Sequence, residues 1–254
     1  MLVLEQVSVE VGGQRLLRDI DMQILPGETH VMFGPNGSGK TSLLMAIMGY
    51  PGYTVSHGKI SFQSEDITGL PLDERARRGI GLAFQRPPTI NGLKTRRLIE
   101  LAAGAGVDVD ALAERVQLGR FLDRDVNAGL SGGEIKRSEL LQLMAQEPEL
   151  FLFDEPESGV DVENLPLVGN TIAELLQRRT RCAPDQSIKD FRNHRSKMGL
   201  IITHTGHILE HFCADKAQVL YDGAIACSNH PREILECIEQ QGYEECMTCS
   251  LDKS

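Results

Sequence analysis

The stretch from Gly34 to Thr41 most constrains what this chain can fold into. It reads G-P-N-G-S-G-K-T, the G-x-x-x-x-G-K-S/T pattern of a phosphate-binding loop. An apolar run at Thr29–Phe33 precedes it, and a helix-forming run from Ser42 to Met48 follows. Glycines let the backbone wrap a polyphosphate closely, and the dipole of the following helix favours negative charge at its N-terminus. The pattern predicts a strand, a loop and a helix that bind the phosphates of a nucleotide.

Two side chains of this loop have separate expected roles. The Lys40 ammonium reaches the β and γ phosphates, and the Thr41 hydroxyl is a ligand of Mg²⁺. The nucleotide-binding residues expected in the loop are Gly34, Pro35, Asn36, Gly37, Ser38, Gly39, Lys40 and Thr41. The loop alone indicates a nucleotide phosphate and does not say what the energy is used for.

Composition limits the classes of function. The 254 residues are 41% hydrophobic, which is enough for one large α/β domain or two small ones. The net charge of −10 and the absence of Trp argue against a nucleic-acid surface. No window is apolar for long enough to span a membrane, and the N-terminus lacks the features of a secretory signal. We expect a cytoplasmic protein with no nucleic-acid partner and no direct membrane insertion.

Hydrophobic patterning predicts a chain in which strands and helices alternate. Strands are expected at residues 2–9, 16–25, 29–33, 59–62, 80–84, 150–153, 200–203, 218–221 and 224–227. Helices are expected at 42–48, 71–78, 95–103, 110–116, 132–145, 162–179 and 231–240. We expect one domain over residues 1–254, in which 1–85 and 130–254 form a nucleotide-binding α/β core and 86–129 form a helical insertion.

Two further motifs sharpen this prediction. The apolar run 150–153 ends in Asp154-Glu155, as a Walker B strand does, with one carboxylate toward Mg²⁺ and the next at an attacking water. Leu130-Ser-Gly-Gly-Glu134 has two compatible interpretations. Ser131 and Glu134 satisfy the S-x-x-E capping box of an ordinary helix, and a capped helix N-terminus is also an anion site.

Taken in chain order, the motifs resemble those of the ATP-binding cassette (ABC) ATPases. The matches are GPNGSGKT at 34–41, Gln85 of the Q-loop, LSGGE at 130–134, FLFDE at 151–155, SGVD at 158–161 of the D-loop, and the switch histidine His204. The resemblance implies a P-loop NTPase fold with a central, mostly parallel sheet, an N-terminal antiparallel β subdomain and an inserted helical subdomain. It also implies a Mg²⁺-dependent ATPase.

The resemblance implies that two copies pair head to tail and enclose two ATP molecules. Ser131, Gly132 and Gly133 then face the ATP of the partner copy, and Asp161 signals across the dimer. Within one copy, Ser42 contacts the α-phosphate.

The resemblance also implies roles around the γ-phosphate. Glu155 is the general base, and His204 holds the γ-phosphate. Thr41 and Gln85 are direct Mg²⁺ ligands, and Asp154 is a ligand through water. Members of the family often stack adenine on an aromatic residue, whereas Val11 stands in that region here, so we expect modest discrimination between ATP and GTP.

Loop details resemble the SufC group of this family, the ATPases of Suf-type iron–sulfur cluster assembly. They lie at residues 49–58, 67–71, 83–88, 132–142, 154–161, 203–209 and 219–223, and the link at 49–58 is longer than in transporter subunits. This resemblance implies soluble SufB/SufD-like scaffold partners that dock near Gln85 to Leu101. The alternative is the ATP-binding subunit of a membrane transporter. A DNA-repair or translation ATPase is disfavoured, because the chain has no long coiled-coil insertion and no second cassette.

Three features stay open at this stage. Residues 178–197 carry seven Lys or Arg against two acids, as in a solvated loop or a docking site for an acidic partner. Cys246 and Cys249 form a lone C-x-x-C that could hold free thiols, contact a metal or cluster, or form a redox pair. His207 and His211 have helical i, i+4 spacing and could be surface residues or metal ligands.

Overall fold

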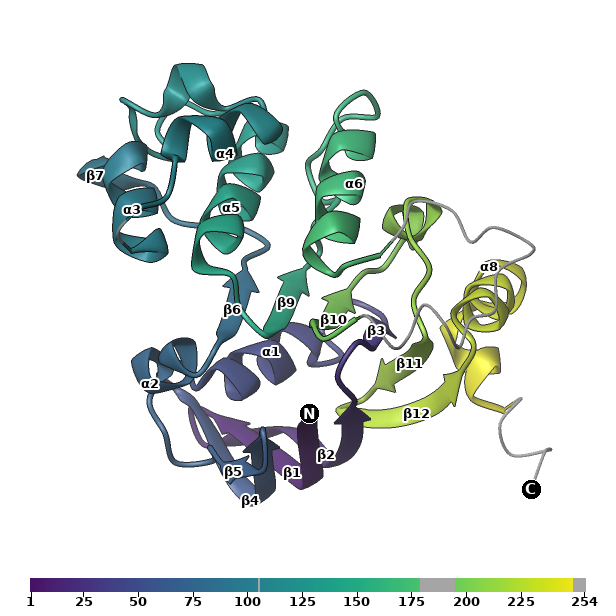
Figure 1. Ribbon diagram of the computed structural model, residues 1–254. Coiled ribbons are helices and arrows are strands. Elements are labelled where there is room, and N and C mark those ends of the chain that lie inside the picture. The colour runs from purple at the N-terminus through teal and green to yellow at the C-terminus, as the bar shows by residue number, and fades with distance from the viewer. Residues whose placement is uncertain (105, 179–194, 249–254) are drawn as a thin grey trace.

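A six-stranded sheet forms the centre of the computed structural model, which describes residues 1–104, 106–178 and 195–248 (Figure 1). Its order is β12 (Ala224–Asn229), β11 (Lys216–Tyr221), β3 (Thr29–Phe33), β10 (Met198–Ile202), β9 (Leu150–Asp154), β6 (Ile80–Ala83). Neighbouring strands are parallel except for the antiparallel pair of β11 and β12. Every residue of β3, β9 and β10 is buried, as expected for parallel strands covered on both faces.

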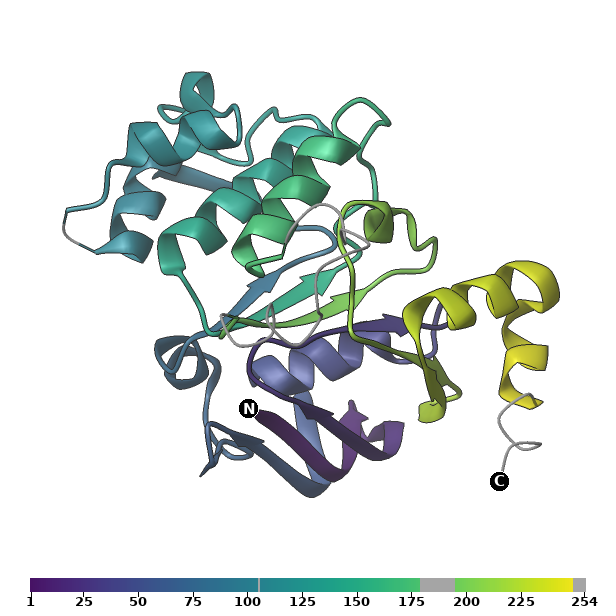
Figure 2. The same ribbon diagram turned by 45° about the vertical axis from the view of Figure 1, so that its right-hand side comes forward.

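A second, antiparallel sheet covers one side of the helix that follows the Gly34–Thr41 loop. Its order is β2 (Gln14–Ile24), β1 (Leu2–Val11), β4 (Tyr53–Phe62), β5 (Glu65–Asp66). Helix α1 (Lys40–Met48) lies between the two sheets (Figures 1 and 2). Its Leu43, Leu44 and Ile47 belong to one apolar core with Leu4 of β1 and Leu200 of β10. This core fixes α1 at the carboxyl end of β3.

The helical insertion stands beyond the β6 edge of the central sheet (Figures 1 and 2). It contains β7 (Ile90–Lys94), α3 (Thr95–Ala103), α4 (Val109–Arg115), the 3-10 turn η1 (Gly119–Phe121) and β8 (Asp125–Val126). The long helix α5 (Gly132–Gln146) packs against α3 and shares an apolar core with it. The short helix α2 (Leu72–Arg77) joins β5 to β6.

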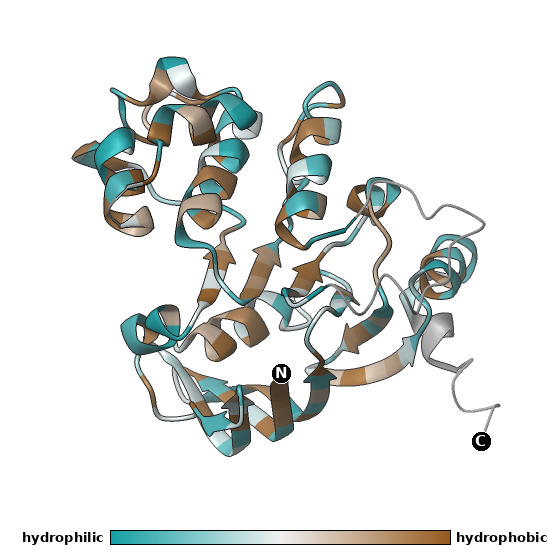
Figure 3. Ribbon diagram, in the orientation of Figure 1, coloured by the Kyte–Doolittle hydropathy of each residue, from teal (hydrophilic) through white to brown (hydrophobic). Residues whose placement is uncertain are grey.

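The remaining helices cover the other face of the central sheet. Helix α6 (Leu165–Leu175) packs on β9 and β10, and α8 (Pro231–Thr248) packs on β3 and β11. The 3-10 turn η2 (His207–Glu210) follows β10. The hydropathy view shows the strands β6, β9 and β10 as apolar (Figure 3). No helix within the described residues combines the length and the apolar character that a membrane crossing requires.

The predicted fold class is confirmed by the parallel-rich sheet, the N-terminal antiparallel sheet and the helical group. The domain limits at residues 86 and 130 stay predictions. Several element limits are wrong, and the largest differences in a starting residue are those of β4 and α6. Strand β4 begins at Tyr53 and not at Lys59, because it pairs with β1 up to Val11. Helix α6 begins at Leu165 and not at residue 162, because Asp161 accepts a hydrogen bond from the Asn164 N–H (2.9 Å) and holds a turn.

Candidate active site

The glycines of the phosphate-binding loop stand where no side chain fits. Gly34 has φ 155°, and a Cβ there would lie 2.3 Å from the Leu220 carbonyl oxygen. Gly39 has φ 102°, and its Cβ would lie 2.6 Å from a methyl group of Leu17. Both contacts are too close for any Cβ, so the loop needs glycine at these points to turn from β3 into α1.

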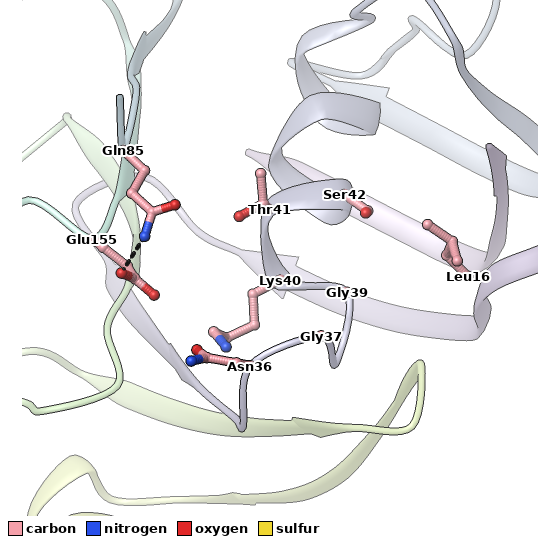
Figure 4. Close-up of a pocket in the computed structure, with 9 residues that line it drawn as sticks. All are labelled: Leu16, Asn36, Gly37, Gly39, Lys40, Thr41, Ser42, Gln85 and Glu155. Carbon is pink, nitrogen blue, oxygen red and sulfur yellow. Dashed lines mark hydrogen bonds between the residues drawn. The ribbon is translucent and has the colours of Figure 1, made fainter. Parts of the chain in front are cut away.

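A pocket of about 420 Å³ opens above this loop (Figure 4). It is lined by Leu16, Asn36, Gly37, Gly39, Lys40, Thr41, Ser42, Gln85 and Glu155. Leu16 lies on the opposite side of the pocket from Gln85 and Glu155 in Figure 4. The pocket therefore has an apolar end at β2 and a polar end at the Q-loop and Walker B strand.

Lys40 is 5% exposed, and its ammonium donates to the carbonyl oxygens of Gly34 (2.7 Å) and Pro35 (2.9 Å). Burial lowers the pKa of Lys40, and the neighbouring Glu155 and Asp154 carboxylates oppose this change. The ammonium thus stands at the rim of the loop, with its desolvation only partly offset. A phosphate in the pocket would supply the missing counter-charge.

Thr41 and Asp154 meet directly at the floor of the pocket. The Thr41 hydroxyl donates to the Asp154 carboxylate at 3.0 and 3.2 Å. Asp154 is 2% exposed, and burial raises its pKa, while the hydrogen bond from Thr41 opposes this change. A hydroxyl, a carboxylate and the Gln85 amide are the oxygen donors that a hard divalent cation prefers. The residues present therefore fit Mg²⁺.

Glu155 connects the Q-loop to the loop that follows β10. Its backbone has a left-handed φ of 46°, and its N–H donates to the Ile202 carbonyl (3.0 Å). Its carboxylate accepts a hydrogen bond from Gln85 Nε2 (2.6 Å), and His204 Nδ1 lies 3.4 Å from its other oxygen. The Gln85 amide oxygen points toward the side of Thr41 (Figure 4). Three predicted site residues therefore converge on one point.

The signature residues lie elsewhere. Ser131 caps α5 in the predicted capping box: its N–H donates to Glu134 Oε2 (2.8 Å), and its hydroxyl accepts from the Glu134 N–H (3.4 Å). Ser131, Gly132 and Asp161 are exposed and do not line the pocket. A Cβ on Gly132 would lie 2.2 Å from the Gly159 carbonyl oxygen, so the signature and the D-loop touch. Together they form an open surface.

The sequence prediction missed Leu16. Leu16, and not Val11, lines the pocket, since Val11 pairs with Gln14 and Tyr53 at the end of the first hairpin. The β1–β2 register shifts three times before that point, so a count along the chain cannot place the residue. The apolar character of this wall agrees with the expectation of base contact without stacking.

Two residues of α5 that sequence reasoning also missed hold the Q-loop backbone. Lys136 donates to the carbonyl oxygens of Phe84 (2.7 Å) and Gln85 (2.9 Å), and Glu139 accepts from the Phe84 N–H (2.9 Å). Glu139 is 5% exposed, and burial raises its pKa to about 7. The i, i+3 spacing of Lys136 and Glu139 places both side chains on one face of the helix, and this spacing was the sequence feature that could have identified them.

The structure bears differently on the basic segment 178–197, the C-x-x-C pair and the two histidines His207 and His211. Residues 179–194 of the basic segment and Cys249 lie outside the described residues, but Arg178 is buried and pairs with Asp215. Among the described residues, no group of His, Cys, Asp and Glu could hold a metal by itself. His207 lies on a 3-10 turn, 3.8 Å from Glu210, so the helical spacing with His211 is lost.

Comparison with known proteins agrees with this geometry. The sequence matches the ABC transporter family over residues 17–158. It is 32% identical to the probable ATP-dependent transporter SufC of Escherichia coli, over 96% of this chain and 97% of that protein. It is 34% identical to the probable ATP-dependent transporter ycf16 of Cyanidium caldarium, over 96% and 95%.

A solved structure of similar fold is a nucleotide-free ATP-binding cassette from an ABC transporter. It superimposes with a TM-score of 0.76 at 22% identity, over 97% of this chain and 98% of that one. The fold, the family match and the full-length relatives agree. The chain belongs to the ABC family and is an ATP-hydrolysing cassette that resembles SufC.

Proposed function

We propose that this ATPase energises iron–sulfur cluster assembly on a soluble SufB/SufD-like scaffold in the cytoplasm. The observation that carries the proposal is the full-length similarity to a protein named SufC, together with the SufC-like loops of the sequence. The alternative is the ATP-binding subunit of a membrane transporter, since several relatives are described as ATP-dependent transporters. The two functions share the hydrolytic site and differ in the partner.

The proposed hydrolysis follows from the contacts at the polar end of the pocket. Glu155 accepts a proton from the attacking water as the new bond to the γ-phosphorus forms and the bond to the β–γ bridging oxygen breaks. Lys40 neutralises charge on the phosphates. His204, which lies next to the Glu155 oxygen that Gln85 does not use, holds the γ-phosphate. Gln85 positions the Glu155 carboxylate through the 2.6 Å hydrogen bond.

Mg²⁺ would be held by Thr41 and Gln85 directly and by Asp154 through water, and when bound it would neutralise charge on the phosphates. Glu155 lines the pocket and Asp154 is buried behind Thr41, so two carboxylates lie near the place of a polyanionic substrate. Such a pair repels phosphate unless a cation stands between them. The charge balance of the pocket therefore supports Mg²⁺ as part of the proposal.

We further propose that a second copy completes the site. Ser131 and Gly133 would donate to the γ-phosphate of the partner's ATP, Gly132 would face the same ATP, and Asp161 would contact the partner copy. The support is that Ser131, Gly132 and Asp161 are exposed and do not line their own pocket, although Gly133 is buried in the isolated chain. Val162, next to Asp161, is 85% exposed, as an apolar side chain covered by a partner would be in the isolated chain.

The scaffold is proposed to dock on the surface from Gln85 to Leu101. Ile90 and Leu101 are 39% and 61% exposed in this segment, which begins at the Q-loop residue Gln85 that contacts Glu155. Leu101→Asp should weaken scaffold binding and leave the ATPase rate of the isolated protein unchanged. Leu25→Asp is a matched control, since Leu25 is 42% exposed on the β subdomain, far along the chain from this surface. Equal loss of binding in both variants would contradict the docking site.

Affinity purification of a Glu155→Gln variant, with and without ATP, tests the proposed function. The substitution removes the general base but keeps the size and the hydrogen-bonding oxygen of the side chain, so ATP should trap the dimer. Recovery of a SufB- or SufD-like protein with the trapped variant would support the cluster-assembly role. Recovery of a membrane permease would contradict it and favour the transporter alternative.

A further inference from the structure

Two threonines flank His204 and share one acceptor. Thr203 is fully buried at the carboxyl end of β10, and Thr205 lies on the other side of the histidine. Both hydroxyls donate to Oε1 of Glu157, the Thr205 hydroxyl at 3.1 Å. Glu157 is 8% exposed and belongs to the loop between β9 and α6. One carboxylate oxygen thus holds both sides of the residue that carries the switch imidazole.

The same network folds the His204 loop onto itself. The Thr203 hydroxyl oxygen accepts hydrogen bonds from the N–H groups of Thr205 (3.2 Å) and Gly206 (2.9 Å). The Thr203 N–H donates to the Met32 carbonyl of β3 (3.2 Å). The hydroxyl of Thr203 therefore donates one hydrogen bond and accepts two. These bonds hold the backbone of the loop around the Glu157 carboxylate. Within this loop, the His204 Nδ1 lies 3.4 Å from the Glu155 carboxylate.

Glu157 also belongs to the segment that forms the D-loop. Its carbonyl accepts from the Val160 N–H (3.1 Å), and the Ser158 N–H donates to the Glu155 carbonyl (3.0 Å). These turns run directly into Asp161, the exposed D-loop aspartate. A displacement of the D-loop therefore reaches the two threonines through a buried side chain.

The second oxygen of Glu157 is buried without a hydrogen-bond partner within the described part of the chain. A buried carboxylate oxygen left in this way costs free energy, and a residue chosen only for stability at this position would avoid it. The two hydroxyl donors both use the other oxygen. A glutamine could keep those two bonds without the buried charge, which gives the site a conservative variant.

We propose that Glu157 is a positioning residue for hydrolysis: it clamps the loop that carries His204 and ties that loop to the D-loop. It touches no reacting atom in this arrangement and acts through His204. The inference rests on the proposed role of His204 at the γ-phosphate. It adds a residue that the motifs of the sequence do not single out, since Glu157 stands between the catalytic Glu155 and the D-loop.

Steady-state ATPase assays on Glu157→Met and Glu157→Gln test the clamp. Methionine removes the acceptor at similar volume, so kcat should fall about 10-fold or more, because misplacing a catalytic group by a fraction of an ångström is costly. The affinity for a fluorescent ATP analogue should stay within about twofold, since the phosphate-binding loop is untouched. Glu157→Gln should keep kcat within about twofold of wild type. Glu163→Met, at an exposed glutamate of the same loop, is the matched control.

Combination with His204→Ala separates positioning from a general structural effect. If Glu157 acts through His204, adding Glu157→Met to His204→Ala should lower kcat by less than about twofold. Thr205→Val is a milder variant that should lower kcat in the same direction, and it serves if Glu157→Met fails to fold.

Three results would overturn the inference. The first is an unchanged kcat in both Glu157→Met and Thr205→Val while His204→Ala is impaired. The second is an equal loss of kcat in Glu157→Gln and Glu157→Met. The third is a loss of kcat on adding Glu157→Met to His204→Ala that is as large as the loss it causes in the wild type. An undiminished kcat in His204→Ala would instead overturn the proposed role of His204, and the clamp with it.

Discussion

Arg75 holds the C-terminal end of α1, the helix whose N-terminal end is proposed to bind phosphate. It is 2% exposed on α2, and its guanidinium donates to four backbone carbonyls. The acceptors are Ala46 (2.8 Å), Ile47 (2.9 Å), Thr68 (2.8 Å) and Leu70 (2.9 Å). The first two belong to the last turn of α1, where the N–H of the C-cap residue Gly49 also donates to the Ala46 carbonyl (3.2 Å). Arg75→Met removes all four bonds at similar side-chain length.

The expected loss follows from these contacts. A hydrogen bond from a charged group contributes about 1.5–3 kcal/mol, so four sum to about 6 kcal/mol at the low end. Burial opposes this gain, because it lowers the pKa of Arg75 to about 10 by disfavouring the charged form. Desolvation of a buried cation takes back several kcal/mol. We therefore expect Arg75→Met to lower the free energy of unfolding by about 3 kcal/mol.

Urea unfolding followed by circular dichroism measures this loss, with Arg77→Met as the matched control. Arg77 lies on the same helix and pairs with Asp73, but its side chain is 69% exposed. A surface pair of this kind contributes about 0–1 kcal/mol. Equal unfolding free energies for the two variants, or a loss below about 1 kcal/mol for Arg75→Met, would refute the reasoning.

Three further predictions concern the site. Glu155→Gln should lower kcat by about 10²–10⁴-fold with ATP binding retained, as measured by phosphate release and equilibrium binding; an unchanged kcat would exclude Glu155 as the base. Leu16→Tyr should add a stacking surface and tighten ATP binding several-fold, whereas the wild type should bind ATP and GTP with similar constants. Burial raises the pKa of Glu139 to about 7, so folding takes up a proton and stability should fall as pH rises from about 4.5 to about 7. Glu139→Gln should flatten that slope, by up to about 1.4 kcal/mol per pH unit in urea unfolding.

The parts of the site that could be predicted from the sequence depend on short-range chemistry. The loop from Gly34 to Thr41 needs glycine at fixed points, because the backbone φ is positive there, at 155° for Gly34 and 102° for Gly39. The capping box at Ser131 is likewise satisfied within four residues. Such constraints involve residues that are close together in the sequence, so a sequence motif is enough to identify them.

The parts that could not be predicted depend on contacts between distant segments. Arg75 belongs to a short charged helix and looks like a surface residue until α1 is placed beside it. Leu16 reaches the pocket because the register of the β1–β2 pair shifts, and no spacing rule gives that shift. The limits of β4 and α6 are set by pairing with β1 and by the Asp161 turn. In each case a tertiary contact decides what local preference leaves open.

The central claim is that each hydrolytic site is shared between two copies of the chain. It can be tested by mixing two inactive variants, Glu155→Gln and Ser131→Arg, without nucleotide and then adding ATP with Mg²⁺. A mixed dimer has one site with both lesions and one site with neither, since Ser131 and Glu155 of one copy serve different ATP molecules.

Random pairing of equal amounts puts half of the chains in mixed dimers, each with one intact site. The account therefore predicts about a quarter of the wild-type rate from two preparations that are inactive alone. The measurement is the initial rate of phosphate release, before trapped Glu155→Gln homodimers accumulate, at a protein concentration where the wild-type rate per chain no longer rises. A rate no higher than the sum of the two separate variants would contradict the shared site.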